Sequence, residues 1–270
     1  MTALTRNAAP TAEDFGRMSP REVRQAMREG RFHLPTTRNV ARGHVQCALV
    51  VLPHRYAFDF LVFCQRNQRP CPVYEVTDRG SWEPCRVAPG ADVRTDVALY
   101  HVYRHGKLDA KVEAITDLWH DDLVAFLIGS NTSCDLALNR AGVQTEKNRW
   151  VLRTNIPTDP AGPFSGPLSV TMRWLTPKEA ITATQVTQRF PFNHGAPYHI
   201  GDPAMIGADL ANPITGQPVT EIPKDVVPVF WACSMTPLEV AIAAGVELMI
   251  TCAPSKLFIT DIETDKAGLP

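Results

Sequence analysis

The feature that most restricts the fold of this chain is an apolar run, Cys47-Ala-Leu-Val-Val-Leu52, that contains no alternating polar residues. Such a run is typical of a strand that is covered on both faces. It is followed by Arg55–Arg66, where apolar side chains recur at near-helical spacing, and then by the strand-like segment Cys71–Val76. The order strand, helix, strand predicts a βαβ unit and therefore a parallel sheet.

Three helix starts carry the same local pattern. Ser19-Pro-Arg-Glu22, Thr176-Pro-Lys-Glu179 and Thr236-Pro-Leu-Glu239 each combine a capping hydroxyl, proline at the first helical position and a glutamate that completes a capping box. We therefore expect helices to begin at about residues 20, 177 and 237, the first and last ending near Gly30 and Gly245. Short apolar runs predict strands at His44–Leu52, Pro72–Val76, Val97–Tyr103, Leu168–Trp174, Val227–Ala232, Glu247–Cys252 and Lys256–Ile262.

The middle of the chain has a different character. Asp117–Ile128 and Ser133–Ala141 predict two helices that are broken at Gly129. Because this part is flanked by strand–helix–strand patterns, the sequence predicts an α/β fold in which a smaller α+β domain is inserted. The expected division is a flexible lead-in (1–18), a discontinuous α/β domain (19–115 and 195–270) and an inserted α+β domain (116–194).

Charge, cysteine usage and missing motifs argue against several classes of protein. The net charge is −1 over 270 residues and the basic residues are dispersed, so no nucleic-acid partner is expected. Seven cysteines without metal-ligand spacing argue against a disulfide framework or a structural zinc site. The N-terminus lacks the pattern of a signal peptide, and the longest apolar stretch, Val240–Ile250, is too short to span a membrane, so a cytoplasmic protein is expected. No dinucleotide, P-loop, zincin or esterase motif is present.

The strongest candidate for chemistry is the segment from Phe192 to Pro203, which contains His194, His199 and Asp202. Glycines and prolines within it prevent a regular helix or strand, so it predicts a rigid loop that carries polar side chains. Histidine exchanges a proton near neutral pH, and an aspartate can orient its ring. Two alternatives stay open: a tight loop whose histidines satisfy backbone groups, and a metal site with two histidines and one carboxylate.

Two further segments could bind an anion. Arg153, with Asn155 two residues later, could hold a carboxylate, although a surface salt bridge is the commoner role of a single arginine. The hydroxyl-rich segment Gly129–Ser133 precedes a predicted helix, where hydroxyls and free amides form an anion site or an ordinary cap. The candidate substrate-binding residues of this segment are Ser130, Asn131, Thr132 and Ser133.

A charged cluster enters the strand expected at residue 97. Alternation along an extended chain would place Asp92, Arg94 and Asp96 on one face, either as part of a binding site or as a solvated edge. Arg94 and Asp96 are therefore candidate substrate-binding residues, as is Cys233 at the end of a predicted strand. Cys64, by contrast, is expected to lie in the core.

Several blocks together make the sequence similar to the D-glutamate cyclase family, whose bacterial members are commonly labelled presumptive hydro-lyases. The resemblance extends from about Ser19 to Asp261. The matching blocks, in family order, are Phe63-Cys-Gln-Arg-Asn67, Gly90-Ala-Asp-Val-Arg-Thr-Asp96, Asp121-Asp-Leu-Val-Ala-Phe-Leu-Ile-Gly129, Arg153-Thr-Asn-Ile-Pro157, His194-Gly-Ala-Pro-Tyr-His-Ile-Gly-Asp-Pro203 and Val229-Phe-Trp-Ala-Cys233. The resemblance implies a three-layer α/β domain with a smaller two-layer α+β domain, and cyclodehydration of D-glutamate to 5-oxo-D-proline.

The sequence departs from the family pattern in three segments. Where members usually continue Cys-Ser-Phe-Ser-Phe-Glu after the glycine, this chain has Ser130-Asn-Thr-Ser-Cys-Asp135. Where members usually have His-Ala-Pro-Gly-His, it has Cys252-Ala-Pro-Ser-Lys256, and the early Pro-Thr-Ala-Gly segment is Pro35-Thr-Thr-Arg38. All three segments are loop-like, and substrate pockets are built from loops. The scaffold is therefore expected to be shared more closely than the substrate.

For a glutamate-like substrate, lactam formation needs a neutral amine, a polarised carboxyl group, a stabilised oxyanion and a proton for the departing water. The corresponding hypothesis gives the substrate's α-carboxylate to Arg153 and Asn155. His199, oriented by Asp202, acts as the base and His194 as the acid. The oxyanion site then lies at 130–133, and Ser133 and Cys233 stay open as nucleophiles.

The sequence leaves three alternatives: elimination of water from a small hydroxy acid, a repurposed paralogue that acts on another amino acid or biosynthetic intermediate, and a non-catalytic carboxylate-binding protein. No cofactor is predicted, and a divalent metal stays open. The expected partner is a small carboxylic-acid or amino-acid substrate rather than a nucleic acid or a membrane, and self-association into a homo-oligomer also stays open.

Overall fold

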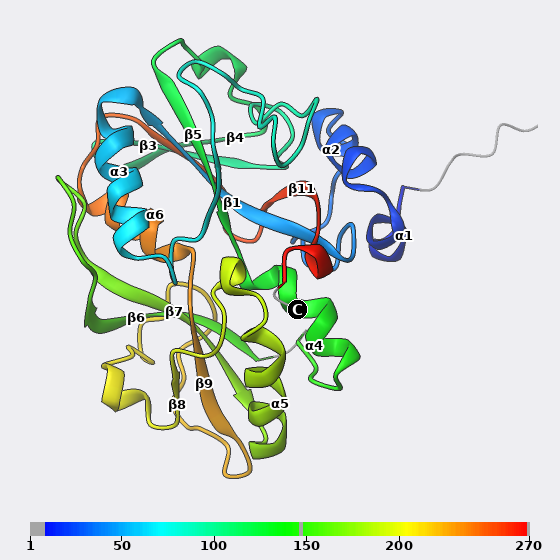
Figure 1. Ribbon diagram of the computed structural model, residues 1–270, viewed down its shortest axis with the longest axis vertical. Helices are drawn as coiled ribbons and strands as arrows, with labels where there is room; N and C mark the ends of the chain where they lie inside the picture. The colour runs from blue at the N-terminus through cyan, green and yellow to red at the C-terminus, as the bar shows by residue number, and fades with distance from the viewer. Residues whose placement is uncertain (1–8, 146–147, 269–270) are drawn as a thin grey trace, which may run out of the picture.

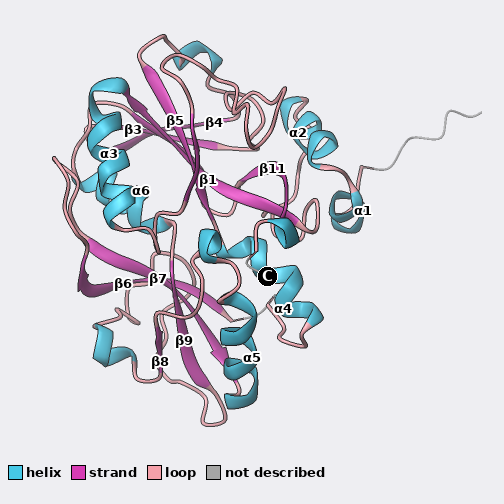
Figure 2. Ribbon diagram, viewed as in Figure 1, coloured by secondary structure: helices cyan, strands magenta, loops and turns pink. Residues whose placement is uncertain are grey.

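The structure, a computed structural model, describes residues 9–145 and 148–268 and is a mixed α/β fold built on two antiparallel sheets (Figures 1 and 2). The helices are α1 (Ala12–Arg17), α2 (Pro20–Arg28), α3 (His54–Arg66), α4 (Asp135–Arg140), α5 (Pro177–Thr187) and α6 (Met235–Ala243). The strands are β1 (His44–Pro53), β2 (Val73–Val76), β3 (Tyr100–Arg104), β4 (Lys107–Val112), β5 (Leu123–Gly129), β6 (Arg149–Pro157), β7 (Pro167–Leu175), β8 (His199–Ile200), β9 (Val227–Ala232), β10 (Met249–Cys252) and β11 (Phe258–Glu263). Short 3-10 helices are η1 (Thr116–Leu118), η2 (Asn131–Cys134), η3 (Pro191–Asn193), η4 (Pro203–Ile206) and η5 (Thr264–Lys266).

The larger sheet is centred on β1 and β5, whose side chains are almost all buried. Its order is β2-β5-β1-β10-β3-β4, and β11 also pairs with β1. β1 and β5 run antiparallel from Cys47 opposite Gly129 to Pro53 opposite Leu123. Because both strands are apolar on both faces, they lie in the main hydrophobic core, with α3 packed against them. This register places the end of β5, and the segment 130–134 after it, beside the start of β1.

The smaller sheet has the order β6-β7-β9-β8, and α5 packs against β7 and β9 (Figure 1). α6 contacts β7 of this sheet and β10 of the larger sheet, so it lies where the two sheets meet. The connection from β9 through α6 to β10 therefore joins the sheets. No helix among residues 9–145 and 148–268 is long and apolar enough to cross a membrane.

Most of the locally encoded elements are confirmed. All seven predicted strands are present, with boundaries that differ by at most a few residues. α2 and α5 begin with the expected capping boxes, in which Ser19 and Thr176 accept hydrogen bonds from the amides of Glu22 and Glu179. Gly30 and Gly245 adopt positive φ angles, of 66° and 64°, after the helices that they were expected to end. Cys64 is buried in the core, as expected.

The expected parallel sheet is wrong, because every strand pairing among the described residues is antiparallel. The order strand, helix, strand of β1, α3 and β2 is present, but β5 lies between the two strands and pairs with both. Short-range pattern cannot reveal a strand that arrives from much later in the chain.

The helix expected at Asp117–Ile128 is also wrong. It is replaced by η1 and β5. Leu123–Gly129 is a continuous apolar run that is buried along its whole length, and hydrophobicity alone does not separate a buried strand from a buried helix. The helix expected at Ser133–Ala141 is present as η2, which begins at Asn131, followed by α4, which ends at Arg140.

Other local predictions need correction. α6 begins at Met235, and Thr236 does not cap it, since its hydroxyl instead bonds with the backbone of Ser169. Within the expected lead-in, residues 12–17 form α1, and Phe15 is fully buried; residues 1–8 lie outside the described part. The segment 91–99 consists of turns, so the alternation expected at Asp92, Arg94 and Asp96 does not occur.

Sheet membership does not follow the predicted domain boundaries. β5, from the segment 116–194, pairs within the larger sheet, whereas β9, from the segment 195–270, pairs within the smaller one. The three-layer arrangement and the division into two domains stay predictions.

Candidate functional site

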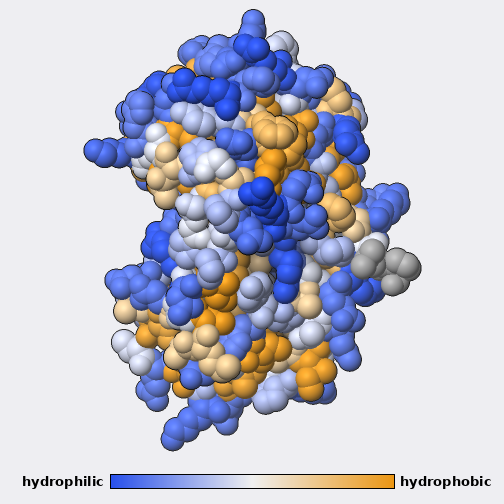
Figure 3. All heavy atoms as spheres, turned by 60° about the vertical axis from the view of Figure 1, so that its left-hand side comes forward, coloured by the Kyte–Doolittle hydropathy of each residue, from blue (hydrophilic) through white to orange (hydrophobic). Residues whose placement is uncertain are grey.

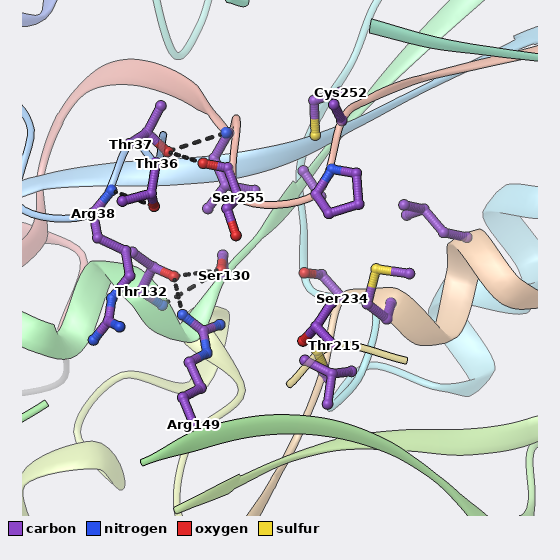
Figure 4. A pocket seen from close by; sticks show the side chains of 18 of the residues that line it. Thr36, Thr37, Arg38, Ser130, Thr132, Arg149, Thr215, Ser234, Cys252 and Ser255 are labelled. Carbon is purple, nitrogen blue, oxygen red and sulfur yellow. Dashed lines mark hydrogen bonds between the residues drawn. The ribbon is translucent and has the colours of Figure 1, made fainter. Parts of the chain in front are cut away.

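A cavity of about 330 Å³ lies where the two sheets meet (Figure 4). Four strand ends supply most of its wall: the end of β5, the end of β10, the junction of β9 with α6, and the start of β6. The loop at 36–38 completes it. Figure 3 shows the molecule narrowing between its upper and lower parts, with hydrophilic side chains gathered there. The residues that line the cavity are Thr36, Thr37, Arg38, Ala48, Ser130, Thr132, Arg149, Val151, Thr215, Gly216, Cys233, Ser234, Met235, Leu238, Cys252, Ala253, Pro254, Ser255 and Leu257.

Arg149, the first residue of β6, provides a positive charge in the cavity wall. Its Nη1 donates to Thr132 Oγ1 at 3.1 Å and its Nη2 to Asn131 Oδ1 at 3.0 Å (Figure 4 shows the first of these contacts). Both acceptors are neutral, and no carboxylate among residues 9–145 and 148–268 forms a salt bridge with Arg149. Burial and the charge of Arg173 lower its pKa to about 10, so the guanidinium remains charged at neutral pH. Arg149 is therefore held in place without being neutralised.

Two more arginines share one carboxylate beside the cavity. Asp135, which is 2% exposed, accepts from Arg38 Nε at 3.1 Å and from Arg173 Nη2 at 2.8 Å. Arg38 and Arg173 also donate to the carbonyl of Thr145. With Arg149, this cluster contains three guanidinium groups and one carboxylate. It is therefore net positive, which favours an anionic ligand.

The rest of the wall consists of hydroxyls, thiols and apolar side chains. Ser130 Oγ donates to Thr132 Oγ1, and Thr37 Oγ1 accepts from the amide of Leu257. Burial raises the pKa of the Cys252 thiol to about 11, so this thiol is protonated at neutral pH. None of the described lining residues carries a carboxylate or an imidazole.

The three segments that depart from the family pattern meet in this cavity. Residues 36–38, Ser130 with Thr132, and residues 252–255 form adjacent parts of its wall. The expectation that the changed loops would build a pocket therefore agrees with the structure.

His194 does not line the cavity. It has a φ angle of 74°, it is 1% exposed, and its Nδ1 contacts the carbonyl oxygen of Arg69 at 2.7 Å. Its Nε2 is buried without a hydrogen-bond partner among the described residues. Burial, helped by the charges of Arg149 and Arg69, lowers its pKa to about 4, against the effect of the Arg69 contact. The ring is therefore neutral at neutral pH, which does not suit the predicted role as an acid.

His199 and Asp202 are neighbours, but not in the predicted way. His199 Nε2 contacts the backbone oxygen of Asp202 at 2.9 Å, while the Asp202 carboxylate accepts from the amide of Ala204 and caps η4. The carboxylate therefore does not orient the ring, and neither residue lines the cavity. The alternative weighed from the sequence, a loop whose polar groups satisfy its own backbone, describes these contacts better. A catalytic role for His199 and Asp202 stays a prediction that the geometry does not favour.

Arg153 and Asn155 are exposed residues of β6 outside the cavity lining. Alternation places Arg153 on the same face of the strand as Arg149 and Val151, but farther along it. Arg153 Nε donates to Glu239 Oε2 at 2.6 Å, and the Arg153 side chain is 50% exposed, which is the surface salt bridge weighed as the alternative. The true cavity arginine of β6 is Arg149, four residues earlier.

The remaining predicted residues divide into two groups. Ser130, Thr132 and Cys233 line the cavity, and Asn131 holds Arg149. Ser133, however, exchanges hydrogen bonds with the backbone of Gln46 and serves to attach η2 to β1.

Arg94 and Asp96 are also outside the cavity lining. Arg94 pairs with Asp92 and lies over the Trp82 ring, with its Cζ atom 4.0 Å from the ring centroid. Asp96 is fully buried and accepts two hydrogen bonds, each 2.8 Å long, from Arg28 of α2. This cluster holds α2 against the loop at 91–99.

Sequence reasoning missed Arg149, Thr37, Ser234 and Cys252 as site residues. Cys252 and Thr37 could have been found, because both lie in segments that depart from the family pattern. Arg149 and Ser234 carried no local signal, because only the meeting of the two sheets places them together. Among residues 9–145 and 148–268, no group of three or more His, Cys, Asp or Glu side chains is arranged to hold a metal ion.

Comparison with known proteins identifies a family whose model matches part of this chain. The family model described as D-glutamate cyclase matches residues 124–261. That span contains β6, β9, β10 and all of β5 but its first residue, and the ends of these strands line the cavity.

Close relatives cover nearly the whole chain, and their names label them presumptive hydro-lyases. The protein of Stutzerimonas stutzeri (strain A1501) is 48% identical over 258 residues, which is 93% of this chain and 97% of the relative. The protein of Geobacillus kaustophilus (strain HTA426) is also 48% identical, with the same coverage of 93% and 97%. YcsI of Bacillus subtilis (strain 168) is 46% identical and covers 93% of this chain and 100% of its own length.

Among solved structures, a nitrogen repressor-like protein, MJ0159, from Methanococcus jannaschii matches with a TM-score of 0.38 and 10% identity. The match covers 89% of this chain and 97% of that one. A TM-score this low does not establish a shared fold.

Proposed function

This chain belongs to the D-glutamate cyclase family and is a hydro-lyase, a carbon–oxygen lyase, and from this premise we propose that its cavity removes water from a small carboxylic acid. The observation that carries the proposal is Arg149, a charged guanidinium held in the cavity wall by two neutral oxygens. A carboxylate pairs with a guanidinium through two parallel hydrogen bonds. A substrate carboxylate would therefore give Arg149 a negatively charged partner.

The composition of the wall favours cyclodehydration of a glutamate-like substrate over elimination from a hydroxy acid. Elimination requires a base that removes a carbon-bound proton, and no described lining residue offers a carboxylate or an imidazole. In lactam formation the nucleophile is the substrate's own amine. The protein therefore needs only to hold the substrate, polarise its carboxyl group and transfer protons. A cavity of hydroxyls, thiols and one free arginine is suited to that task.

The proposed reaction balances within the substrate. The ammonium group passes one proton to the side-chain carboxylate, and the neutral nitrogen then attacks the carboxyl carbon to form the C–N bond. The tetrahedral intermediate then expels one oxygen as its C–O bond breaks. That oxygen leaves as water with two of the three ammonium protons, and the lactam nitrogen keeps the third. The Cys252 thiol, which burial keeps protonated, can pass a proton to the departing oxygen and regain one from the amine.

The test is turnover followed by mass spectrometry. The purified chain is incubated separately with D-glutamate, L-glutamate and a set of small hydroxy acids, and each product is examined for the loss of one water. We expect lactam formation from a glutamate-like acid. Product from hydroxy acids alone would reject cyclodehydration, and no turnover together with tight binding of a carboxylate would favour a binding protein.

The arginine assignment is tested by a matched pair of variants on the same strand. Arg149→Gln should lower kcat/KM by about 100-fold or more, because it removes a charged, bidentate contact. Arg153→Gln changes only the exposed pair with Glu239 and should leave kcat/KM within about twofold. If Arg153→Gln lost activity instead, the substrate would bind farther along β6, at Arg153, and the proposed site would be wrong.

A further inference from the structure

The N-terminus of α6 opens into the same cavity. Cys233, Ser234 and Met235, at the junction of β9 with this nine-residue helix, all line the wall. The amide of Thr236 donates to the carbonyl of Cys233, and Pro237 has no amide hydrogen. None of the hydrogen bonds within the described residues uses the amide of Ser234 or Met235. Two backbone donors are therefore left at the positive end of the helix dipole.

Ser234 gives an independent sign that a ligand binds there. Its residue is 8% exposed, its side chain makes no capping hydrogen bond, and no partner for its hydroxyl occurs among the described residues. The hydroxyl oxygen is not sealed from solvent, so it opens into the cavity that Ser234 lines and is placed to bond with a ligand there. Figure 4 shows Ser234 on the far side of the cavity from Thr132 and Arg149.

The two ends of the cavity therefore present different donors. One end has the Arg149 guanidinium, fixed by Asn131 and Thr132. The other has the Ser234 hydroxyl and the amides at the start of α6. Glu239, the acidic residue of α6, is paired with Arg153 outside the lining, so it does not place a negative charge in this subsite.

We infer that the N-terminus of α6 is an oxyanion subsite, in which the Ser234 hydroxyl and the Met235 amide bind the carboxyl group that the substrate's amine attacks. This inference rests on the proposed function and locates within it the donors for the charged oxygen of the tetrahedral intermediate. It replaces the segment 130–133 in that role, since Ser133 bonds to β1 and Ser130 bonds to Thr132.

The chemistry explains why such a subsite matters. As the C–N bond forms, the carbonyl π electrons move onto oxygen, and the negative charge is greatest just before the C–O bond breaks. Donors fixed beforehand, at a helix end and in a buried hydroxyl, stabilise that charge without having to reorganise. Arg149 at the other end holds the second carboxylate, so the substrate is oriented by an oxygen group at each end.

Binding of two unreactive acids tests the subsite without relying on turnover. Glutarate carries a carboxylate at each end, whereas butyrate carries only one, and their affinities are measured by titration calorimetry on the full chain. We expect glutarate to bind at least about 10-fold more tightly than butyrate. Ser234→Ala should weaken glutarate about 10-fold and leave butyrate within about twofold, because only glutarate reaches both ends. Equal affinities, or no binding of glutarate, would overturn the inference.

Turnover of the acid that the mass-spectrometric assay identifies as substrate separates a catalytic role of Ser234 from simple binding. Removal of one oxyanion donor typically lowers kcat by about 100-fold or more, so kcat of Ser234→Ala should fall much more than KM rises. Ser234→Thr keeps the hydroxyl and should recover most of the activity. Ser165→Ala, on an exposed loop outside the lining, is the control and should behave as the native chain.

The two proposals fail in different ways. If the native chain turned over no tested acid but bound glutarate in a Ser234-dependent manner, the proposed reaction would be wrong and the carboxyl-binding site at Ser234 would stand. If Ser234→Ala turned over a glutamate-like acid at the native rate, the subsite would be wrong and the proposed function would stand. Circular dichroism checks that each variant keeps the native fold. Substitution of Ser234 is not expected to weaken the start of α6, because its side chain makes no capping hydrogen bond.

Discussion

His194 should make the stability of this protein strongly dependent on pH. Its ring is 1% exposed, its Nδ1 contacts the Arg69 carbonyl oxygen at 2.7 Å, and its Nε2 has no partner within the described residues. Burial is the main reason that its pKa falls from 6.5 to about 4. The folded state therefore holds this imidazole neutral under conditions in which the unfolded chain would protonate it.

The sign and size of the effect follow from proton linkage. Between the unfolded pKa of 6.5 and the folded pKa of about 4, the unfolded state binds one more proton than the folded state. The free energy of unfolding therefore falls as the pH is lowered through this window, and it is unaffected by His194 above it. At about 1.4 kcal/mol per pKa unit, the lowered pKa corresponds to roughly 3 kcal/mol.

His194→Asn removes the titration and keeps the local geometry. Asparagine tolerates the φ angle of 74°, and its side-chain amide can donate to the Arg69 carbonyl. Free energies of unfolding are measured by urea denaturation at several values between about pH 7 and about pH 4. We expect the native protein to lose about 3 kcal/mol more than the variant over this range.

His105→Asn is a matched control, because His105 also has a positive φ angle, of 49°, but lies exposed at the turn between β3 and β4. It should reproduce the pH dependence of the native protein. Parallel curves for the native protein and His194→Asn would refute the reasoning, since they would mean that the buried ring does not lose its proton affinity on folding.

Two further perturbations test how the cavity wall is supported. Gly129→Ala would place a Cβ atom 2.0 Å from the Phe192 carbonyl oxygen, so we expect the free energy of unfolding, measured in urea, to fall by about 3 kcal/mol. Gly90 has a φ angle of 77° and open space around it, so Gly90→Ala should lower the free energy of unfolding by only about 1 kcal/mol through backbone strain. Asp135→Asn leaves the buried Arg173 without its carboxylate and should destabilise the fold by about 3 to 5 kcal/mol, whereas Asp109→Asn, in an exposed pair with Arg104, should cost less than about 1 kcal/mol. Comparable losses for the two members of either pair would contradict the roles assigned to Gly129 and Asp135.

Local chemistry in the sequence was enough to predict many elements. The capping boxes of Ser19 and Thr176 are satisfied by residues three positions away, so they form wherever the helix lies. The strands β1 and β9 were equally visible, since their apolar content matches their burial. The resemblance to a family also followed from the sequence, because it rests on blocks of consecutive residues.

Where sequence reasoning failed, the deciding contact was remote. The apolar run of β5 fits either a helix or a strand, and only its pairing with β1 and β2 decides between the two structures. In the candidate site, Arg153 shares a face of β6 with Arg149 by alternation, but it lies beyond the cavity and pairs with Glu239 of α6. The histidine-rich loop was chemically capable, yet its polar groups are used by backbone atoms such as the Arg69 carbonyl.

The sequence by itself thus determined the helix ends, the buried strands and the family, because these depend on contacts within a few residues or on the order of residues alone. The tertiary structure decided that the strand pairings of residues 9–145 and 148–268 are all antiparallel and that Arg149 and Ser234 face one cavity. The physical reason is that strand pairing and cavity walls bring together residues that are distant in the chain: Thr37, Ser130, Arg149, Ser234 and Cys252 meet only because four strand ends converge where the two sheets join. No local pattern records that convergence.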